Sequence, residues 1–207
     1  MLNHNGLAAP SITVGVMGAA GGLIPKDVRA KAHELGVEIA RRKYVLITGA
    51  CPGLPQEAVR GAKEMGGFVV GISPGLNFQE HIQKYRSPWF GYDAIIYTGS
   101  GLMGREIENI RSCDFIIFAG GRSGTLGEFA IAYDEGRIIG VLRGTGGITD
   151  HLDTIISFTA KETGADVAYD SDPKALLDKL SSIYHQRTLP LYLELLRDSN
   201  PDGELNP

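Results

Sequence analysis

The fold of this 207-residue chain is constrained most by its short apolar runs. These runs end in glycine-rich turns and alternate with amphipathic segments. The clearest run, residues 115–118, leads through a turn at 119–125 into a helical pattern over 126–133. Strand and helix patterns alternate in this way along most of the chain, which is typical of a parallel sheet covered by helices on both faces. The sequence therefore predicts a three-layer α/β fold with a mainly parallel sheet of six or seven strands.

The predicted strands are short and mostly apolar, and they cover residues 11–17, 44–48, 68–72, 94–97, 115–118, 137–142 and 166–169. The predicted helices cover residues 25–41, 55–65, 102–112, 126–133, 151–158 and 173–184. Residues 77–92, which are rich in aromatic and polar side chains, form either a loop or a short helix that covers a pocket. We expect one domain over residues 1–185, followed by a tail over 186–207 in which 189–196 could dock as a short helix.

The charge and cysteine content narrow the expected partners. A net charge of −4 leaves no basic field for a nucleic-acid backbone, so we expect no nucleic-acid partner. Cys51 and Cys113 lack metal-ligand spacing, and the five histidines are scattered, so we expect reduced thiols, no metal and no resident cofactor. No apolar run approaches the roughly 18 residues of a membrane helix, and residues 1–10 lack the pattern of a signal peptide. These features predict a cytoplasmic protein without a membrane partner.

The turn after the 115–118 strand is the strongest candidate site. Glycines allow close approach to an oxyanion, and the first N–H groups of the following helix favour negative charge. The alternative is that the glycines only make a tight turn. The candidate phosphate-binding residues of this turn are Gly120, Gly121, Arg122, Ser123, Gly124 and Thr125.

Two further glycine-rich turns, at 18–22 and 49–53, also follow predicted strands. Parallel strands end at the same edge of the sheet, where ligands bind at the topological switch point, so we expect the three turns to converge on one crevice. Neither the G-x-G-x-x-G dinucleotide fingerprint nor a Walker loop is present. The additional ligand-binding candidates are Gly18, Ala19, Gly21 and Gly49.

Glu128 and Arg105 are the candidates for chemistry. Glu128 follows Thr125 by three residues, so its carboxylate could act on a ligand held by the turn; alternatively, Thr125 and Glu128 form a capping box. Arg105 lies near the start of the preceding helix, where its guanidinium could grip a phosphate or polarise a base; the alternative is an ordinary surface arginine.

These residues resemble the LOG (Lonely Guy) family, whose members were once described as possible lysine decarboxylases. The family pattern is an arginine, a helix, an aspartate before an apolar strand, and Pro-Gly-Gly-x-Gly-Thr-x-x-Glu. The residues that match it in order are Arg105, Asp114, Gly120, Gly121, Gly124, Thr125 and Glu128. The resemblance implies a Rossmann-like fold, a nucleotide-type ligand and a homodimer.

Family members with the full motif cleave nucleoside 5′-monophosphates into base and ribose 5-phosphate. By this resemblance Arg105 and Glu128 would be the catalytic pair, and the glycines with Thr125 would hold the 5′-phosphate. This chain departs from the pattern, because Ala119 replaces the proline, Arg122 and Ser123 stand where the family has one residue, and Glu106 replaces a lysine.

The departures are typical of a side branch that includes carriers of molybdenum cofactor and sensors of nucleotide-derived ligands. Two main hypotheses follow: a nucleoside-monophosphate phosphoribohydrolase, or a carrier or sensor that binds a nucleotide or pterin phosphate without turnover. A third is a structural subunit whose glycines only turn. Nothing in the sequence marks a pyridoxal-phosphate lysine, so lysine decarboxylation is not expected.

Overall fold

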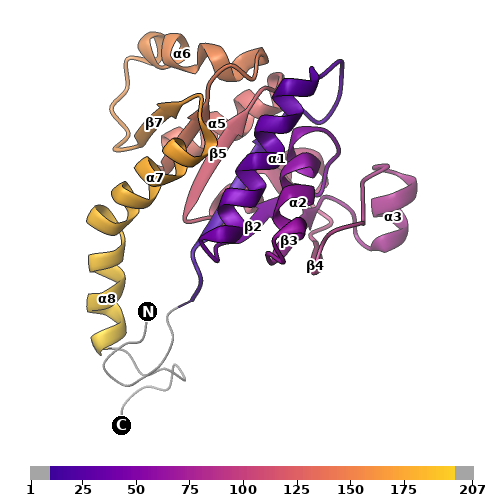
Figure 1. The fold of residues 1–207 in the computed structure, drawn as a ribbon, viewed down its shortest axis with the longest axis horizontal. Coiled ribbons are helices and arrows are strands. Elements are labelled where there is room, and N and C mark those ends of the chain that lie inside the picture. The colour runs from indigo at the N-terminus through magenta and orange to yellow at the C-terminus, as the bar shows by residue number, and fades with distance from the viewer. Residues whose placement is uncertain (1–9, 199–207) are drawn as a thin grey trace.

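The computed structural model describes residues 10–198, whose fold is drawn in Figure 1. It has one seven-stranded, entirely parallel sheet with the strand order β4-β3-β2-β1-β5-β6-β7. The predicted α/β class and parallel sheet are confirmed. The strands are β1 Thr13–Gly18, β2 Val45–Thr48, β3 Val69–Ser73, β4 Ala94–Tyr97, β5 Phe115–Ala119, β6 Ile138–Leu142 and β7 Asp166–Asp170.

Helices connect the strands and cover both faces of the sheet. They are α1 Lys26–Arg41, α2 Leu54–Glu64, α3 Phe78–Gln83, α4 Gly101–Arg111, α5 Ser123–Asp134, the 3-10 turn η1 Gly147–His151, α6 Leu152–Thr159, α7 Pro173–Arg187 and α8 Leu189–Asp198. One core cluster holds the buried side chains of α1, α2 and α7, and the other holds those of α4, α5 and α6. The three layers are therefore α1–α2–α7, the sheet, and α4–α5–α6.

The order of the strands places the switch point between β1 and β5. From β1 the chain adds β2, β3 and β4 on one side, and then crosses back to add β5, β6 and β7 on the other. Every residue of β5 is buried, as expected for a central strand covered on both faces. The turns that follow β1 and β5 thus leave the same edge side by side, where an open α/β sheet leaves a crevice.

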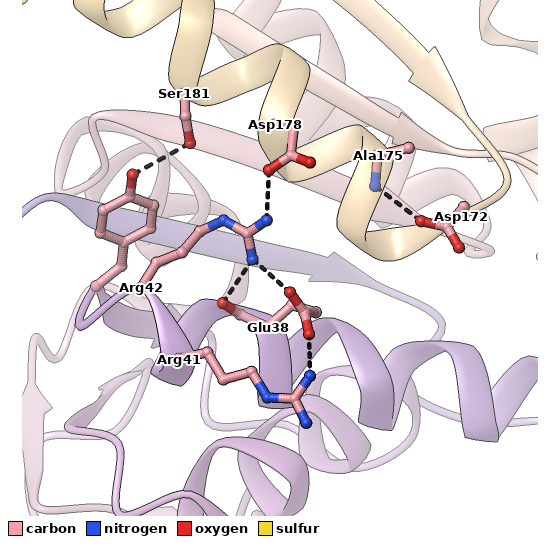
Figure 2. Close-up of polar contacts among 8 residues, drawn as sticks. Glu38, Arg41, Arg42, Asp172, Ala175, Asp178 and Ser181 are labelled. Atoms are coloured by element: carbon pink, nitrogen blue, oxygen red, sulfur yellow. Dashed lines mark hydrogen bonds and ion pairs between the residues drawn. The ribbon is translucent and has the colours of Figure 1, made fainter.

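The α1–α7 face is held by a network of charged side chains (Figure 2). The guanidinium of Arg42 donates to Glu38 at 2.6 Å and to Asp178 of α7 at 2.5 Å. Arg41 donates to the other oxygen of Glu38. Asp172 caps α7 by accepting from the amide of Ala175 at 2.7 Å. These contacts fix α7 against α1 and leave each carboxylate with a cationic or N–H partner.

The start of α5 differs from the sequence-based expectation, whereas two other segments adopt an alternative that the sequence left open. Helix α5 begins at Ser123, so the second half of the predicted turn is the first turn of the helix. Residues 77–92 contain the short helix α3, and the tail forms α8, which extends two residues beyond the predicted 189–196. Residues 1–9 and 199–207, which belong to the predicted N-terminal segment and tail, lie outside the described residues, and the division at residue 185 stays a prediction.

The described part of the chain holds neither a helix long and apolar enough to cross a membrane nor a cluster of three or more histidine, cysteine, aspartate or glutamate side chains that could hold a metal ion.

Candidate functional site

The three glycine-rich turns converge at the carboxyl edge of the sheet, as the sequence predicts. The amide of Ala19, after β1, donates to the carbonyl of Ala119 at 3.1 Å, and the carbonyl of Ala19 accepts from the amide of Leu54 at 2.8 Å. A Cβ added to Gly120 would lie 3.3 Å from the Cβ of Ala19. Ala19, the first residue after β1, therefore contacts both the turn that follows β2 and the turn that follows β5.

A cleft of about 580 Å³ opens where these turns meet. Of the predicted site residues, nine line it: Gly18, Ala19, Gly49, Arg105, Arg122, Ser123, Gly124, Thr125 and Glu128. Tyr85 and Ser87 in the remaining wall belong to the 77–92 segment, which was expected to cover a pocket. The sequence analysis did not assign the rest of the wall to a site, and this part includes Cys51, Pro52, Pro55, Pro74, Leu102 and Glu106. Burial raises the pKa of the Cys51 thiol to about 11, so this thiol is protonated at neutral pH.

Three predicted ligand-binding residues lie outside the lining of this cleft within the described structure. Gly21 is exposed, and a Cβ added there would meet no atom within 4 Å. Gly120 and Gly121 are buried behind the cleft and have φ angles of 61° and 94°, which favour glycine. The amide of Gly120 donates to the hydroxyl of Thr145 at 2.8 Å, so it is not available to a phosphate. The two glycines shape the turn instead.

The segment after β6 supports this turn from behind. Thr149 donates its hydroxyl to the carbonyl of Gly120, and the amide of Ile148 donates to the carbonyl of Gly121 at 3.0 Å. Thr145 also donates to the carbonyl of Leu142 at 2.6 Å. Thr145, Ile148 and Thr149 therefore hold the 120–121 turn in place.

The first turn of α5 supplies the free N–H groups. Its N-cap residue, Arg122, makes no side-chain capping hydrogen bond, and the helical ladder starts with the amide of Leu126, which donates to the carbonyl of Arg122 at 3.0 Å. The amides of Ser123, Gly124 and Thr125 precede that ladder, as the first N–H groups of any helix do. Because these residues line the cleft, its floor is an uncapped helix N-terminus.

The capping-box alternative for Glu128 is wrong. Thr125 is the third residue inside α5 rather than its cap, and the Glu128 carboxylate turns toward α4. There its Oε1 lies 3.3 Å from Nη1 of Arg105 and 3.5 Å from Nδ2 of Asn109. Arg105 and Asn109 are one helical turn apart on α4, so both reach the same carboxylate oxygen.

The surface-arginine alternative for Arg105 is also wrong, because this side chain is buried beside the cleft. A Cβ on Gly49 would lie 2.0 Å from Nη1 of Arg105, so a glycine at position 49 makes room for the guanidinium. Within the described residues, Nε of Arg105 and Oδ1 of Asn109 are buried without a hydrogen-bond partner. Buried polar atoms usually have partners, so a bound molecule would complete this arrangement.

Burial raises the pKa of Glu128 to about 7, with Glu106 adding to the rise while Arg105 and Asn109 oppose it. Its carboxyl group therefore gains or loses a proton close to neutral pH. A group of this kind can exchange a proton with a ligand, and pKa values near the working pH are typical of acid–base residues.

The 77–92 segment forms one wall of the cleft through Tyr85 and Ser87. His81 of α3 is fully buried and holds this segment to β3, since its Nδ1 lies 2.9 Å from the hydroxyl of Ser73 and its Nε2 lies 3.0 Å from the carbonyl of Pro88. A carbonyl only accepts, so Nε2 carries the proton and Nδ1 accepts from Ser73. Trp89 and Phe90 are exposed and are not part of the described cleft lining.

A second cavity, of about 490 Å³, lies at the opposite edge of the sheet between α8 and the amino ends of the strands. Its wall is largely aromatic and aliphatic, with Tyr44, Tyr184 and Tyr192 among its residues. Asp114 lies there, and its carboxylate accepts from the amide of Thr13 at 2.8 Å, which joins the starts of β1 and β5. The motif aspartate is thus a strand contact, and the glycine-rich cleft is the better candidate site.

Fold and cleft together define a Rossmann-like α/β protein whose cleft lies at the topological switch point of its sheet. More specifically, the chain belongs to the SLOG cluster4 family, whose model matches residues 11–177. The resemblance to LOG-type proteins seen in the sequence is thereby confirmed.

Three proteins of known sequence or structure are similar to this chain. An uncharacterized protein of Archaeoglobus fulgidus is 34% identical over 130 residues, which are 63% of this chain and 79% of that protein. The molybdenum cofactor binding protein of Rippkaea orientalis has 28% identity and a TM-score of 0.68, over 85% of this chain and 99% of that one. The molybdenum cofactor carrier protein of Chlamydomonas reinhardtii has 25% identity and a TM-score of 0.67, with the same coverage.

Proposed function

We propose that this protein binds a small phosphate-bearing molecule of the pterin or nucleotide class in the 580 Å³ cleft and carries it without turnover. The observation that carries the proposal is the uncapped start of α5, where the amides of Ser123, Gly124 and Thr125 line the same cleft as the buried guanidinium of Arg105. Backbone N–H groups at a helix start, together with an arginine, form a favourable environment for a phosphate.

The cleft has a suitable size and wall for such a ligand. Sites for small molecules commonly measure about 300–1,000 Å³ and combine apolar walls with a few polar groups. Here Pro52, Pro55, Pro74 and Leu102 supply apolar surface beside the polar floor. Two similar structures are named as a molybdenum cofactor binding protein and a molybdenum cofactor carrier protein, which favours carriage over catalysis.

A second candidate, phosphoribohydrolase activity, is favoured by one observation. Glu128 has a pKa raised to about 7 and lies 3.3 Å from Arg105 in the same cleft. In this proposal the carboxylate of Glu128 would stabilise an oxocarbenium-like transition state, while Arg105 would assist the departing base.

Base release separates the two candidates. The purified protein is incubated with a panel of nucleoside 5′-monophosphates, free base is measured by chromatography, and binding of each nucleotide and of a pterin phosphate is measured by calorimetry. Carriage predicts binding without base release, and Arg105→Ala should weaken this binding by about 100-fold, the loss of a charged contact worth roughly 3 kcal/mol.

The matched controls are Glu128→Ala and Glu34→Ala, the latter at an exposed position of α1. Base release that is lost in Glu128→Ala and kept in Glu34→Ala would establish the hydrolase and overturn carriage without turnover. Absence of binding to any phosphate compound would overturn both candidates.

A homodimer and a cytoplasmic location belong to the same proposal. Met103 and Ile107 on α4 expose apolar surface next to the cleft, where a second copy could pack. Light scattering on the purified protein measures its mass in solution, and a monomer at micromolar concentration would overturn the proposed dimer.

A further inference from the structure

Glu106 places a carboxylate against the phosphate-binding end of α5. It follows Arg105 on α4 and lines the cleft. Its Oε1 lies 3.5 Å from the position that a Cβ on Gly124 would take, and its Oε2 lies 3.1 Å from the corresponding position on Gly127. Both glycines belong to the first turns of α5, so a negative charge already lies beside the N–H groups that would hold an anion.

This carboxylate is half-buried, and no hydrogen bond or ion pair joins it to another described residue. Burial raises its pKa above the ordinary value, and the nearby Arg105 opposes that rise. A partly buried carboxylate without a donor partner is energetically unfavourable, and a donor from a ligand would relieve it.

The charges of the whole cleft balance when both glutamates are ionised. Its lining contains two arginines, Arg105 and Arg122, and two glutamates, Glu106 and Glu128. Arg105 pairs with Glu128 through Nη1 alone, so Arg105, Arg122 and the α5 amides attract an anion while Glu106 repels it. A phosphate dianion without a neighbouring donor group is therefore both attracted and repelled electrostatically at this end of α5.

We propose that Glu106 is a specificity determinant of the cleft: it selects phosphate compounds that present a hydrogen-bond donor or a positive charge next to the phosphate, and it weakens the binding of phosphates that lack one. The inference rests on the proposed binding of phosphate at the start of α5. It narrows the ligand class to phosphates with a neighbouring hydroxyl, N–H or amino group.

Three small phosphate esters of similar size test this inference: ethyl phosphate, 2-hydroxyethyl phosphate and 2-aminoethyl phosphate. Their dissociation constants are measured by NMR titration at pH 8, where the phosphate is a dianion. The unmodified protein should prefer the amino compound over ethyl phosphate by about fivefold, with the hydroxyl compound between them. In Glu106→Gln, ethyl phosphate should bind about tenfold more tightly, and the preference should disappear.

Glu108→Gln is the matched control. Glu108 lies on the same helix, about 200° around its axis from Glu106, and accepts from the hydroxyl of Ser100 at 2.8 Å rather than lining the cleft. This variant changes the net charge equally and should keep the preference of the unmodified protein. Glu106→Ala, with thermal unfolding as a folding check, gives the same comparison without the amide group.

Unchanged affinities and an unchanged preference in Glu106→Gln would overturn this inference while leaving the proposed function intact. Equal gains in Glu106→Gln and Glu108→Gln would overturn it as well, because the effect would then be one of net charge. If none of the three esters binds any of these proteins, the proposed function fails and the inference fails with it.

Discussion

Glu38 on α1 and Glu128 on α5 are buried to nearly the same extent, with 5% and 6% of their surface exposed, yet their pKa values move in opposite directions. Burial alone would raise the pKa of Glu38, but hydrogen bonds from Arg42 and Arg41 outweigh it and lower the pKa below its ordinary value. For Glu128 burial prevails, because Arg105 and Asn109 oppose it only in part.

The difference has two causes: Glu38 lies closer to the protein surface than Glu128, and it has more partners at shorter distances. Glu38 receives two guanidinium groups at 2.5 and 2.6 Å (Figure 2), whereas Glu128 receives one at 3.3 Å. A fully partnered carboxylate stabilises the fold, and an incompletely partnered one reduces stability and is available to a ligand. The α1–α7 face is thus a structural network, and the cleft holds charge that the fold itself does not satisfy.

Removing each carboxylate gives the largest contrast. Glu38→Gln should lower the free energy of unfolding by about 2 kcal/mol, because it weakens the charge-assisted hydrogen bonds from Arg41 and Arg42. Glu128→Gln should raise it at pH 7.5, since the cost of burying an ionised group disappears. Urea unfolding measures both, and equal losses in the two variants would contradict the distinction.

The pH dependence of stability sharpens the same contrast. The folded pKa of Glu128, about 7, lies above its unfolded value of about 4.5. Its ionisation therefore does not change the free energy of unfolding below pH 4.5. Between pH 4.5 and pH 7 the ionisation lowers that free energy progressively, and above pH 7 the loss is constant. Relative to Glu128→Gln, the unmodified protein should lose roughly 3 kcal/mol across this window. Parallel curves from pH 4 to pH 8 would show that the pKa is not raised.

The stability that Glu38 contributes depends on pH in the opposite direction. Its folded pKa lies below 4.5, so the stability that it contributes is present above the unfolded pKa and is lost as the pH falls through the folded one. The difference between the unmodified protein and Glu38→Gln should therefore shrink only in acid.

A smaller effect on stability is expected from Thr145, which supports the 120–121 turn behind the cleft. Thr145→Val removes the acceptor for the amide of Gly120 and the donor to the carbonyl of Leu142, so unfolding should become easier by about 1–2 kcal/mol. Thr154→Val, at an exposed position of α6, is the control and should change stability little. If the two variants behave alike, Thr145 does not hold the 120–121 turn.

The smallest expected effect is that of Asn109→Leu on the pKa of Glu128. Asn109 donates weakly to Glu128 and so opposes the rise of its pKa. The variant should raise the pKa of Glu128 further above 7, which a carbon-13 NMR titration of the side-chain carboxyl group measures. A lower or unchanged value would show that Asn109 does not stabilise the ionised form.

The sequence predicted the sheet and the edge that carries the cleft, because buried strands and glycine-rich turns leave local patterns. It placed the start of α5 too late, since Ser123 and Gly124 are weak helix formers and their conformation depends on the surrounding fold. It also gave Gly120 a direct role in binding, although the amide of Gly120 is taken by Thr145, which is 25 residues away.

Two residues that support the cleft from behind its lining have no local signal in the sequence. Asn109 and His81 resemble ordinary helix residues in the sequence, and only the packing of α4 against α5, and of α3 against β3, shows what they contact. Long-range contacts of this kind follow from the tertiary structure rather than from periodicity or spacing.

The most direct test of the central claim is a proton–nitrogen-15 NMR titration with adenosine 5′-monophosphate and with inorganic phosphate. If phosphate binds at the start of α5, the largest changes should occur at the amides of Ser123, Gly124 and Thr125 and at the side-chain Nε–H of Arg105. Changes confined to the cavity lined by Tyr44, Tyr184 and Tyr192, or no changes at saturating ligand, would contradict the account.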